Sequence, residues 1–169
     1  MGISDTDLSA AEAGLLEWLA LGMHGEMDYM AKHGTKRSRP AELLPGTLRV
    51  ISLRMDCMPP DARDSWQVLE EGERAFISRY ALGRDYHKVM RSRLAKLAEK
   101  IRDEVAEFEG RVFADSAPVM EVELARKAGI GWRGKHTLLL SREHGSRFFL
   151  GEIYVSLPLP ADEPEQEHC

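Results

Sequence analysis

Hydrophobic side chains recur at every third or fourth position between residues 86 and 108, which is the spacing of a helix with one buried face. The recurring positions are Tyr86, Met90, Leu94, Leu97, Ile101, Val105 and Phe108. Asp85 stands just before this stretch, where a side-chain carboxylate can accept a backbone N–H of the first turn. The pattern therefore predicts a long amphipathic helix that begins after Asp85.

Shorter patterns predict helices and strands on both sides of this helix. Ser9 and Glu12 form a capping box, which predicts a helix over residues 9–21. Residues 25–34 and 117–128 favour two further helices. Apolar, β-branched runs predict strands over residues 47–55, 111–114, 136–140 and 147–156. Because helices and strands interleave, we expect an α+β fold with a mixed, layered sheet and flanking helices.

The composition is that of an ordinary globular domain: 169 residues, 43% hydrophobic and 30% charged, with a net charge of -5. So small a negative charge gives no overall attraction to nucleic acid, and any polyanion site must be local. Two cysteines suit a reducing compartment, and Glu17 interrupts the longest apolar run near the start. We therefore expect a cytoplasmic protein with no membrane partner. The acidic, proline-rich residues 158–169 predict a linker after a folded domain at residues 1–157.

Gly129, Gly131 and Gly134 have the spacing of a dinucleotide-binding fingerprint, and the lysine that follows nearly completes a phosphate-binding loop. Both motifs need a strand before the glycines and a helix after them, because the phosphate lies at the helix N-terminus. Here the predicted order is reversed, so we interpret Gly129 as the end of a helix with a positive φ. Arg133 and Lys135 in the same turn leave an anion cradle open as an alternative.

Asp115 follows a predicted strand and precedes a predicted helix, with Pro118 shortly after it. That position is typical of an aspartate that caps a helix. A carboxylate at the end of a strand, among the small residues Ala114, Ser116 and Ala117, is also open to a ligand and can be kept protonated by burial. The pattern leaves both interpretations open.

Two further groups of polar residues have alternative interpretations. Tyr86 and His87 lie in the first turn of the predicted long helix, where a histidine is either a surface or capping group or a catalytic one. Four cations form a local basic patch that is either a solvated loop or a site for a phosphate backbone: Lys32, Lys36, Arg37 and Arg39. This patch is the basis of one alternative function, a non-catalytic phosphate- or tRNA-binding module.

Five blocks along the chain closely resemble the amino-terminal half of the epoxyqueuosine reductase family. In order they are HGEMDYMAKH, RPAELLPGTLRVIS, YALGRDYHKVMRSRL, DSAPVMEVELARKAGIGWRGKHTLLL and FFLGEIYVSLPLPAD, and the resemblance extends over nearly the whole chain. It implies an enzyme that reduces the epoxide of epoxyqueuosine at the wobble position of tRNA, with cobalamin and two 4Fe–4S clusters as cofactors. It also implies a nitroreductase-like, corrinoid-binding fold and an external electron donor; we expect a monomer.

The resemblance also assigns roles to residues. Asp115 matches the family's proposed proton donor, a role that a carboxylic acid kept neutral beside the cofactor would fill. The cofactor contacts that it implies are Arg37, Ser78, Asp115, Gly134, Lys135, His136, Leu139 and Leu150. Tyr86 and His87 would flank the substrate cavity. Cys169 matches the first cysteine of an iron–sulfur motif, so the cluster domain would follow this chain, whose start also looks clipped.

One position departs from the family pattern. Relatives often have a basic residue or a proline after the glutamate that matches Glu121, whereas this chain has Val122. We expect another cation, such as Lys127, to replace the missing one, or binding to be weaker. A flavin-dependent nitroreductase-like enzyme is a further alternative function.

Overall fold

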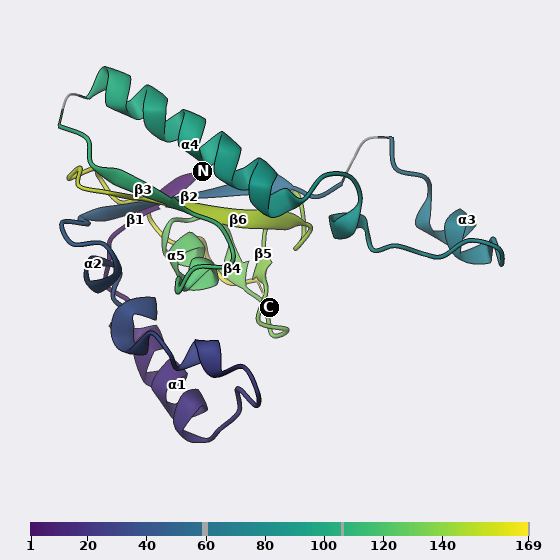
Figure 1. The fold of residues 1–169 in the computed structure, drawn as a ribbon, viewed down its shortest axis with the longest axis horizontal. Helices are drawn as coiled ribbons and strands as arrows, with labels where there is room; N and C mark the ends of the chain where they lie inside the picture. The colour runs from purple at the N-terminus through teal and green to yellow at the C-terminus, as the bar shows by residue number, and fades with distance from the viewer. Residues whose placement is uncertain (59–60, 106, 169) are drawn as a thin grey trace.

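The structure, a computed structural model, describes residues 1–58, 61–105 and 107–168 and is built on a four-stranded sheet (Figure 1). In spatial order the strands are β1 (Gly2–Ser4), β2 (Arg49–Asp56), β6 (Phe148–Val155) and β3 (Gly110–Phe113). Helix α4 (Tyr86–Glu104) covers one face and the short helix α5 (Glu121–Lys127) covers the other. The α+β class is confirmed, but these strands pair antiparallel throughout instead of forming a mixed sheet.

Strands β2 and β6 form the centre of the sheet, because they pair along all 8 residues of each. Side chains alternate between the two faces of a strand. Ile153 and Val155 therefore pack beneath α4, whereas Tyr154 between them packs on the α5 side. Both faces are covered, which explains why β6 is a nearly continuous apolar run, whereas β2 is buried mainly at Val50, Ile51 and Ser52; both strands were predictable from the sequence.

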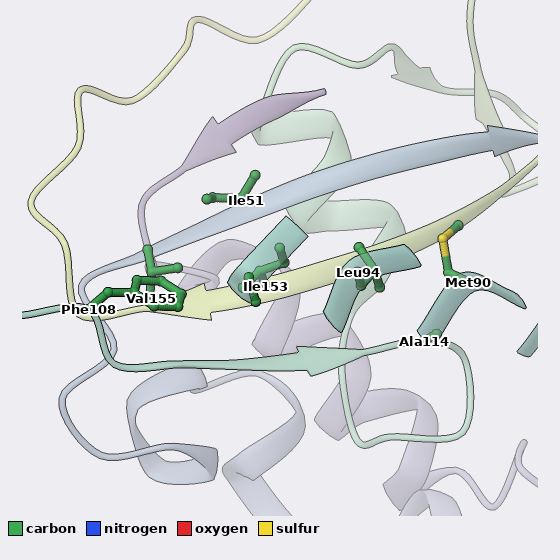
Figure 2. Close-up of a cluster of buried hydrophobic side chains, with 8 residues drawn as sticks. Ile51, Met90, Leu94, Phe108, Ala114, Ile153 and Val155 are labelled. Atoms are coloured by element: carbon green, nitrogen blue, oxygen red, sulfur yellow. The ribbon is translucent and has the colours of Figure 1, made fainter. Parts of the chain in front are cut away.

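The long amphipathic helix is confirmed as α4. The side chain of Asp85 caps it, accepting the backbone N–H of His87 at 3.0 Å. Figure 2 shows the core that α4 forms with the sheet, whose buried members are Ile51, Met90, Leu94, Ala98, Phe108, Ala114, Ile153 and Val155. The helix ends at Glu104, so the last two positions of the predicted stripe lie beyond it, although Phe108 still packs in this core.

Helix α5 begins at Glu121, later than the predicted residue 117. The intervening segment forms tight turns, with Ser116 N–H donating to Ala114 O at 2.8 Å and Val119 N–H to Ala117 O at 2.8 Å. Proline disfavours a helical conformation of the residue before it, so the helix does not extend back through Ala117 and Pro118. The C-terminal prediction is confirmed, because the helix stops before Gly129, which has φ 67°.

Helices α1 and α3 lie away from the sheet (Figure 1). Between β1 and β2 the elements are α1 (Ser9–Ala20), η1 (Asp28–Met30), η2 (Gly34–Arg37) and α2 (Pro40–Leu43). Between β2 and α4 they are α3 (Ser65–Glu70) and η3 (Arg79–Ala81). The helix predicted over residues 9–21 is confirmed as α1, whereas residues 25–34 form only the 3₁₀ turn η1 and the start of η2.

The predicted capping box is wrong. Leu8 precedes α1 and makes no side-chain cap; the carboxylate of Asp7 accepts the N–H of Ser9, the first helical residue, at 3.0 Å. The Glu12 carboxylate instead accepts the Ser38 hydroxyl at 2.6 Å and the Arg39 guanidinium at 2.9 Å. These partners lie 26 and 27 residues further along the chain, and they compete with the local cap that the sequence pattern favours.

Short elements complete the fold around α5. Strands β4 (Trp132–Arg133) and β5 (Leu139–Leu140) form a second, two-stranded sheet, so the strand predicted over residues 136–140 is reduced to its last two residues. The tail after β6 lies along β1: Asp162 N–H donates to Ile3 O at 2.8 Å, and the Asp162 carboxylate accepts Ile3 N–H at 2.8 Å. Among the described residues, no helix combines the length and apolar character needed to cross a membrane.

We predict that Leu94→Ala lowers the free energy of unfolding by about 2–5 kcal/mol, because Leu94 is only 2% exposed at the centre of the α4 core. Urea unfolding followed by circular dichroism measures this loss. The matched control is Leu69→Ala on α3, where the side chain is 53% exposed and the expected change is within about 0.5 kcal/mol. Equal losses in the two variants would contradict this account of the core.

Candidate functional site

Asp115, Tyr86 and His87 meet at one carboxylate oxygen. The Tyr86 hydroxyl donates to Asp115 Oδ2 at 2.6 Å, and His87 Nε2 lies 2.6 Å from the same atom. His87 Nδ1 lies 2.9 Å from Asp85 Oδ1, so the imidazole is held at both nitrogens. The first turn of α4 supplies the ring side chains, and the loop between β3 and α5 supplies Asp115.

Aromatic stacking fixes the Tyr86 ring in this cluster. The ring lies between the imidazole of His87 and the ring of Phe149, with centroids 3.9 Å apart in each pair. The Tyr86 and Phe149 planes differ by only 7°. Because Phe149 belongs to the central strand β6, the sheet directly positions the phenol that hydrogen bonds to Asp115.

The carboxyl group of Asp115 is ionised in this arrangement. The hydrogen bond from Tyr86 lowers the pKa of Asp115 below its usual value; partial burial opposes the shift and the bond to His87 adds to it. For His87, partial burial lowers the pKa, but the bonds to Asp85 and Asp115 outweigh it and raise the pKa above 6.5. Asp115 and protonated His87 form an ion pair, with side chains 51% and 35% exposed, and the raised pKa of His87 favours this charged form.

Two sequence predictions about Asp115 need correction. Burial does not keep its carboxyl group neutral here, because the side chain is half exposed and accepts two short hydrogen bonds. Nor does it cap α5, since Met120 precedes that helix and no side chain caps it. The conformation is nevertheless unusual: Asp115 has φ 57°, a left-handed value that costs a non-glycine residue about 1 kcal/mol.

The backbone around Asp115 is held by charged side chains. Its N–H donates to Glu121 Oε1 at 2.6 Å, and the Arg91 guanidinium donates to the hydroxyl of the next residue, Ser116. Contacts at Oδ2, at the backbone N–H and at the neighbouring hydroxyl thus fix both the side chain and the main chain of the loop.

A second carboxyl group lies behind Glu121. Glu152 on β6 is 0% exposed, and no donor among the described residues reaches either of its oxygens. The charged group that acts on it is the carboxyl group of Glu121. Burial, reinforced by the charge of Asp115, raises the pKa of Glu121 to about 7, and burial next to Glu121 raises the pKa of Glu152 well above its usual value.

The sequence analysis did not single out Glu152. The signal was present, because a lone acid in the apolar run of a central strand must be paired or protonated when both faces of the sheet are covered. The periodicity alone showed only that the strand is buried, and the identity of the partner depends on the fold.

The remaining predicted site residues fall into two groups. Leu139 and Leu150 pack in one apolar cluster beside α5. Gly134, Lys135 and His136 lie in the turn between β4 and β5, where Gly134 is buried and the other two are exposed; Gly134 N–H donates to Leu138 O at 2.9 Å. Arg37 in η2 and Ser78 before η3 lie in the segments that carry α1 and α3. Within the described residues, no hydrogen bond or ion pair links either of them to Asp115; Cys169 lies outside the described residues.

The glycine turn contains no nucleotide-binding motif, because the observed order is α5, glycines, β4. Gly131 is needed for close packing: a Cβ there would lie 1.9 Å from Leu140 O. The neighbouring cations are engaged elsewhere. Arg133 donates to Glu123 at 2.6 Å, and the Lys127 ammonium group contacts Asp5, so Lys127 is already paired.

The basic patch is also partly neutralised. Arg39 donates to Glu12 at 2.9 Å and to Glu42 at 3.0 Å, so it is not a free cation. The Nε of Arg37 is buried and has no acceptor among the described residues. The two lysines of the patch remain as its accessible charges, which weakens the case for a phosphate-backbone site.

Comparisons with known proteins identify the family. The family model described as "Epoxyqueuosine reductase QueG, DUF1730" matches residues 37–116. The chain is 61% identical over its whole length to an epoxyqueuosine reductase of Pseudomonas aeruginosa and covers 47% of that protein. The chain belongs to the epoxyqueuosine reductase family. It is also 55% identical to the Escherichia coli K12 member, again over its whole length, and covers 44% of it.

Solved structures of family members have the same fold. The structure of epoxyqueuosine reductase from Streptococcus thermophilus matches with a TM-score of 0.84 at 25% identity, over 98% of this chain and 44% of that one. The resemblance seen in the sequence is therefore confirmed. Because this chain spans less than half of each epoxyqueuosine reductase compared here, the activity of the whole enzyme is a matter of proposal.

We predict that the paired acids make the folded state less stable as the pH rises. Glu121 has a folded pKa of about 7, above its model-compound value of 4.5, so the folded state binds more protons than the unfolded state between these values. The contribution is fully present below the unfolded pKa and is lost as the pH rises through the folded pKa. Its size is on the order of 3 kcal/mol at most.

Glu152→Gln keeps the shape of the buried side chain and removes its titration. Urea unfolding between about pH 5 and about pH 8 should show a smaller loss of stability in this variant than in the wild type. Glu99→Gln on the exposed face of α4 is the control and should retain the wild-type dependence. If Glu152→Gln also retained the wild-type pH dependence of stability, Glu152 would not hold a proton in the folded state.

Proposed function

We propose that this chain is the catalytic, cobalamin-binding part of an epoxyqueuosine reductase, and that Asp115 delivers a proton to the oxygen of the epoxide. The observation that carries the proposal is the convergence of Tyr86 and His87 on Asp115 Oδ2, at 2.6 Å each, in a chain of this family. Opening an epoxide places negative charge on oxygen, which a positioned acid must neutralise.

The ion pair indicates where the proton is held. Asp115 is ionised and His87 favours the imidazolium form, so the mobile proton lies on Nε2, one hydrogen bond from Asp115 Oδ2. We propose that His87 returns a proton to Asp115 in each turnover, while Asp85 keeps the imidazole oriented through Nδ1. Tyr86 holds the carboxylate from its other side.

The residues of this chain are compatible with a corrinoid. The Nε of Arg37, which is buried without an acceptor among the described residues, is a donor that the amide carbonyls on a corrin periphery would satisfy. Exposed apolar side chains occur near Ser78 at Phe76, Ile77 and Tyr80, and a large ring would cover such surface. When bound, cobalamin would supply the electron chemistry of the reduction, while the protein supplies position and protons.

Arg37, Ser78, His136, Leu139 and Leu150, together with Gly134 and Lys135, are our proposed cofactor contacts. We further propose that two 4Fe–4S clusters and the contact with an external electron donor belong to the part of the enzyme beyond this chain. The working form that we propose is a cytoplasmic monomer. One family member of 25% identity is described with an epoxyqueuosine-modified tRNA stem loop, which supports tRNA as the substrate.

The test is Asp115→Asn in the full-length enzyme, loaded with cobalamin and supplied with a reductant and epoxyqueuosine-containing tRNA. The amide preserves the shape but cannot give up a proton as an acid, so we expect the single-turnover rate to fall roughly 10²–10⁴-fold. Cobalamin binding, followed by its absorption spectrum and retention on desalting, should change little.

The control variant is Asp103→Asn, which removes an exposed aspartate near the end of α4 and should keep the wild-type rate. A wild-type rate in Asp115→Asn would exclude Asp115 as the acid. No retention of cobalamin by the wild type would exclude the corrinoid function, and a yellow, flavin-containing protein would favour the nitroreductase-like alternative.

A further inference from the structure

We propose that Glu121 is a positioning residue that holds the Asp115 loop through a backbone hydrogen bond, and that Glu152 orients Glu121 by sharing one proton with it. This inference rests on the proposed function of Asp115. It assigns a role to two acids that do not take part in the proposed proton transfer from His87 to Asp115. Burying two acids next to each other destabilises the fold, so their presence calls for a role other than stability.

The first step concerns the backbone of Asp115. Asp115 has φ 57°, which asparagine, aspartate and glycine adopt more readily than other residues but which still requires support. The support is a charge-assisted hydrogen bond, because Asp115 N–H donates to Glu121 Oε1 at 2.6 Å. Glu121 is the first residue of α5, so the helix that packs on the sheet directly fixes the loop.

The second step concerns the buried partner. Neither oxygen of Glu152 meets a donor among the described residues, and the group that raises its pKa alongside burial is the carboxyl group of Glu121. Two ionised carboxylates buried beside each other repel, whereas retaining one proton removes that repulsion and lets one acid donate to the other. Since Glu121 accepts the Asp115 N–H, it is the better place for the negative charge once the pair has lost one proton, above a pH of about 7, and the remaining proton then resides on Glu152.

The residues around Glu121 and Glu152 offer few other groups that could neutralise the two acids. Ser52 stands opposite Glu152 on β2 and Phe113 opposite it on β3. The Ser52 hydroxyl is itself buried without a partner among the described residues. The titratable groups that act on the two acids are Asp115 and His87 on the side of the site and Tyr154 further along β6. No lysine or arginine is among them, so a shared proton is the available means of neutralisation.

Together these contacts form a chain from the central strand to the reactive carboxyl. Glu152 is immobile in β6, it orients Glu121, and Glu121 holds the main chain of Asp115. The side chain of Asp115 is left free to exchange its proton with His87, because the clamp acts on the N–H and not on the carboxylate.

The experiment measures hydrogen–deuterium exchange of the Asp115 amide by mass spectrometry, on the protein at the full length that its gene encodes. Glu121→Ala removes the acceptor, so exchange should become roughly 10–100-fold faster, the factor expected for losing a hydrogen bond to a charged group. Glu121→Gln retains an acceptor oxygen and should restore most of the protection. Glu152→Leu removes the group that orients Glu121, so exchange of the Asp115 amide should become faster. Glu152→Gln can still donate a hydrogen bond to Glu121, so its exchange rate should resemble that of the wild type.

The matched control is Glu123→Ala, which removes another buried acid of α5. Glu123 pairs with Arg126 and Arg133 and not with Asp115. Exchange at Asp115 should be unchanged there. Equal protection in Glu121→Ala and wild type, or equal loss in Glu121→Ala and Glu123→Ala, would overturn the positioning role. Wild-type protection in Glu152→Leu would overturn the role of the shared proton.

A second readout links the clamp to activity. In the loaded enzyme, Glu121→Ala should lower kcat at least about tenfold while KM changes little, because the substrate contacts are intact and only the acid is misplaced. An unaltered kcat would overturn the link to catalysis. If the wild type itself did not reduce epoxyqueuosine, the proposed function would fail, and the exchange measurement would still decide whether Glu121 positions Asp115.

Discussion

The pairing of β6 with β2 is the constraint on which both the core and the site depend. Because β6 is central and covered on both faces, its alternate residues contribute side chains to the two cores on opposite faces of the sheet. Phe149 stacks on Tyr86 beneath α4, and Glu152 meets Glu121 beneath α5. A shift of one residue in this register would exchange the faces and separate all four side chains from their partners.

The loop that carries Asp115 connects these two sides of the sheet. It leaves the edge strand β3 and enters α5, so its side chain reaches the first turn of α4 while its backbone reaches Glu121. The left-handed residue and the buried acids each reduce the stability of the fold. Such features persist where the surrounding structure supports them, and here the support comes from elements that also form the hydrophobic core.

The sequence predicted the elements whose patterns are long. The stripe from Tyr86 onwards and the apolar runs of β2 and β6 are sustained over several turns or residues, and packing reinforces what the pattern indicates. The three-residue strand β1 was missed because its stability comes from pairing with β2 and not from its own sequence. The capping box failed at Ser9 because distant partners compete for the Glu12 side chain.

The protonation state of Asp115 shows where sequence reasoning ends and why. The small residues around Asp115 left open whether it caps a helix or is kept neutral by burial, because its pKa depends on Tyr86 and His87, which lie far away in the chain. The half-exposed carboxylate is stabilised partly by water, and any ligand that covers it removes that water and raises its pKa. On the proposed function, covering the site would therefore favour transfer of the His87 proton to Asp115. The acid would then form when the substrate is in place, which explains how an aspartate that is ionised in the open site can still serve as a proton donor.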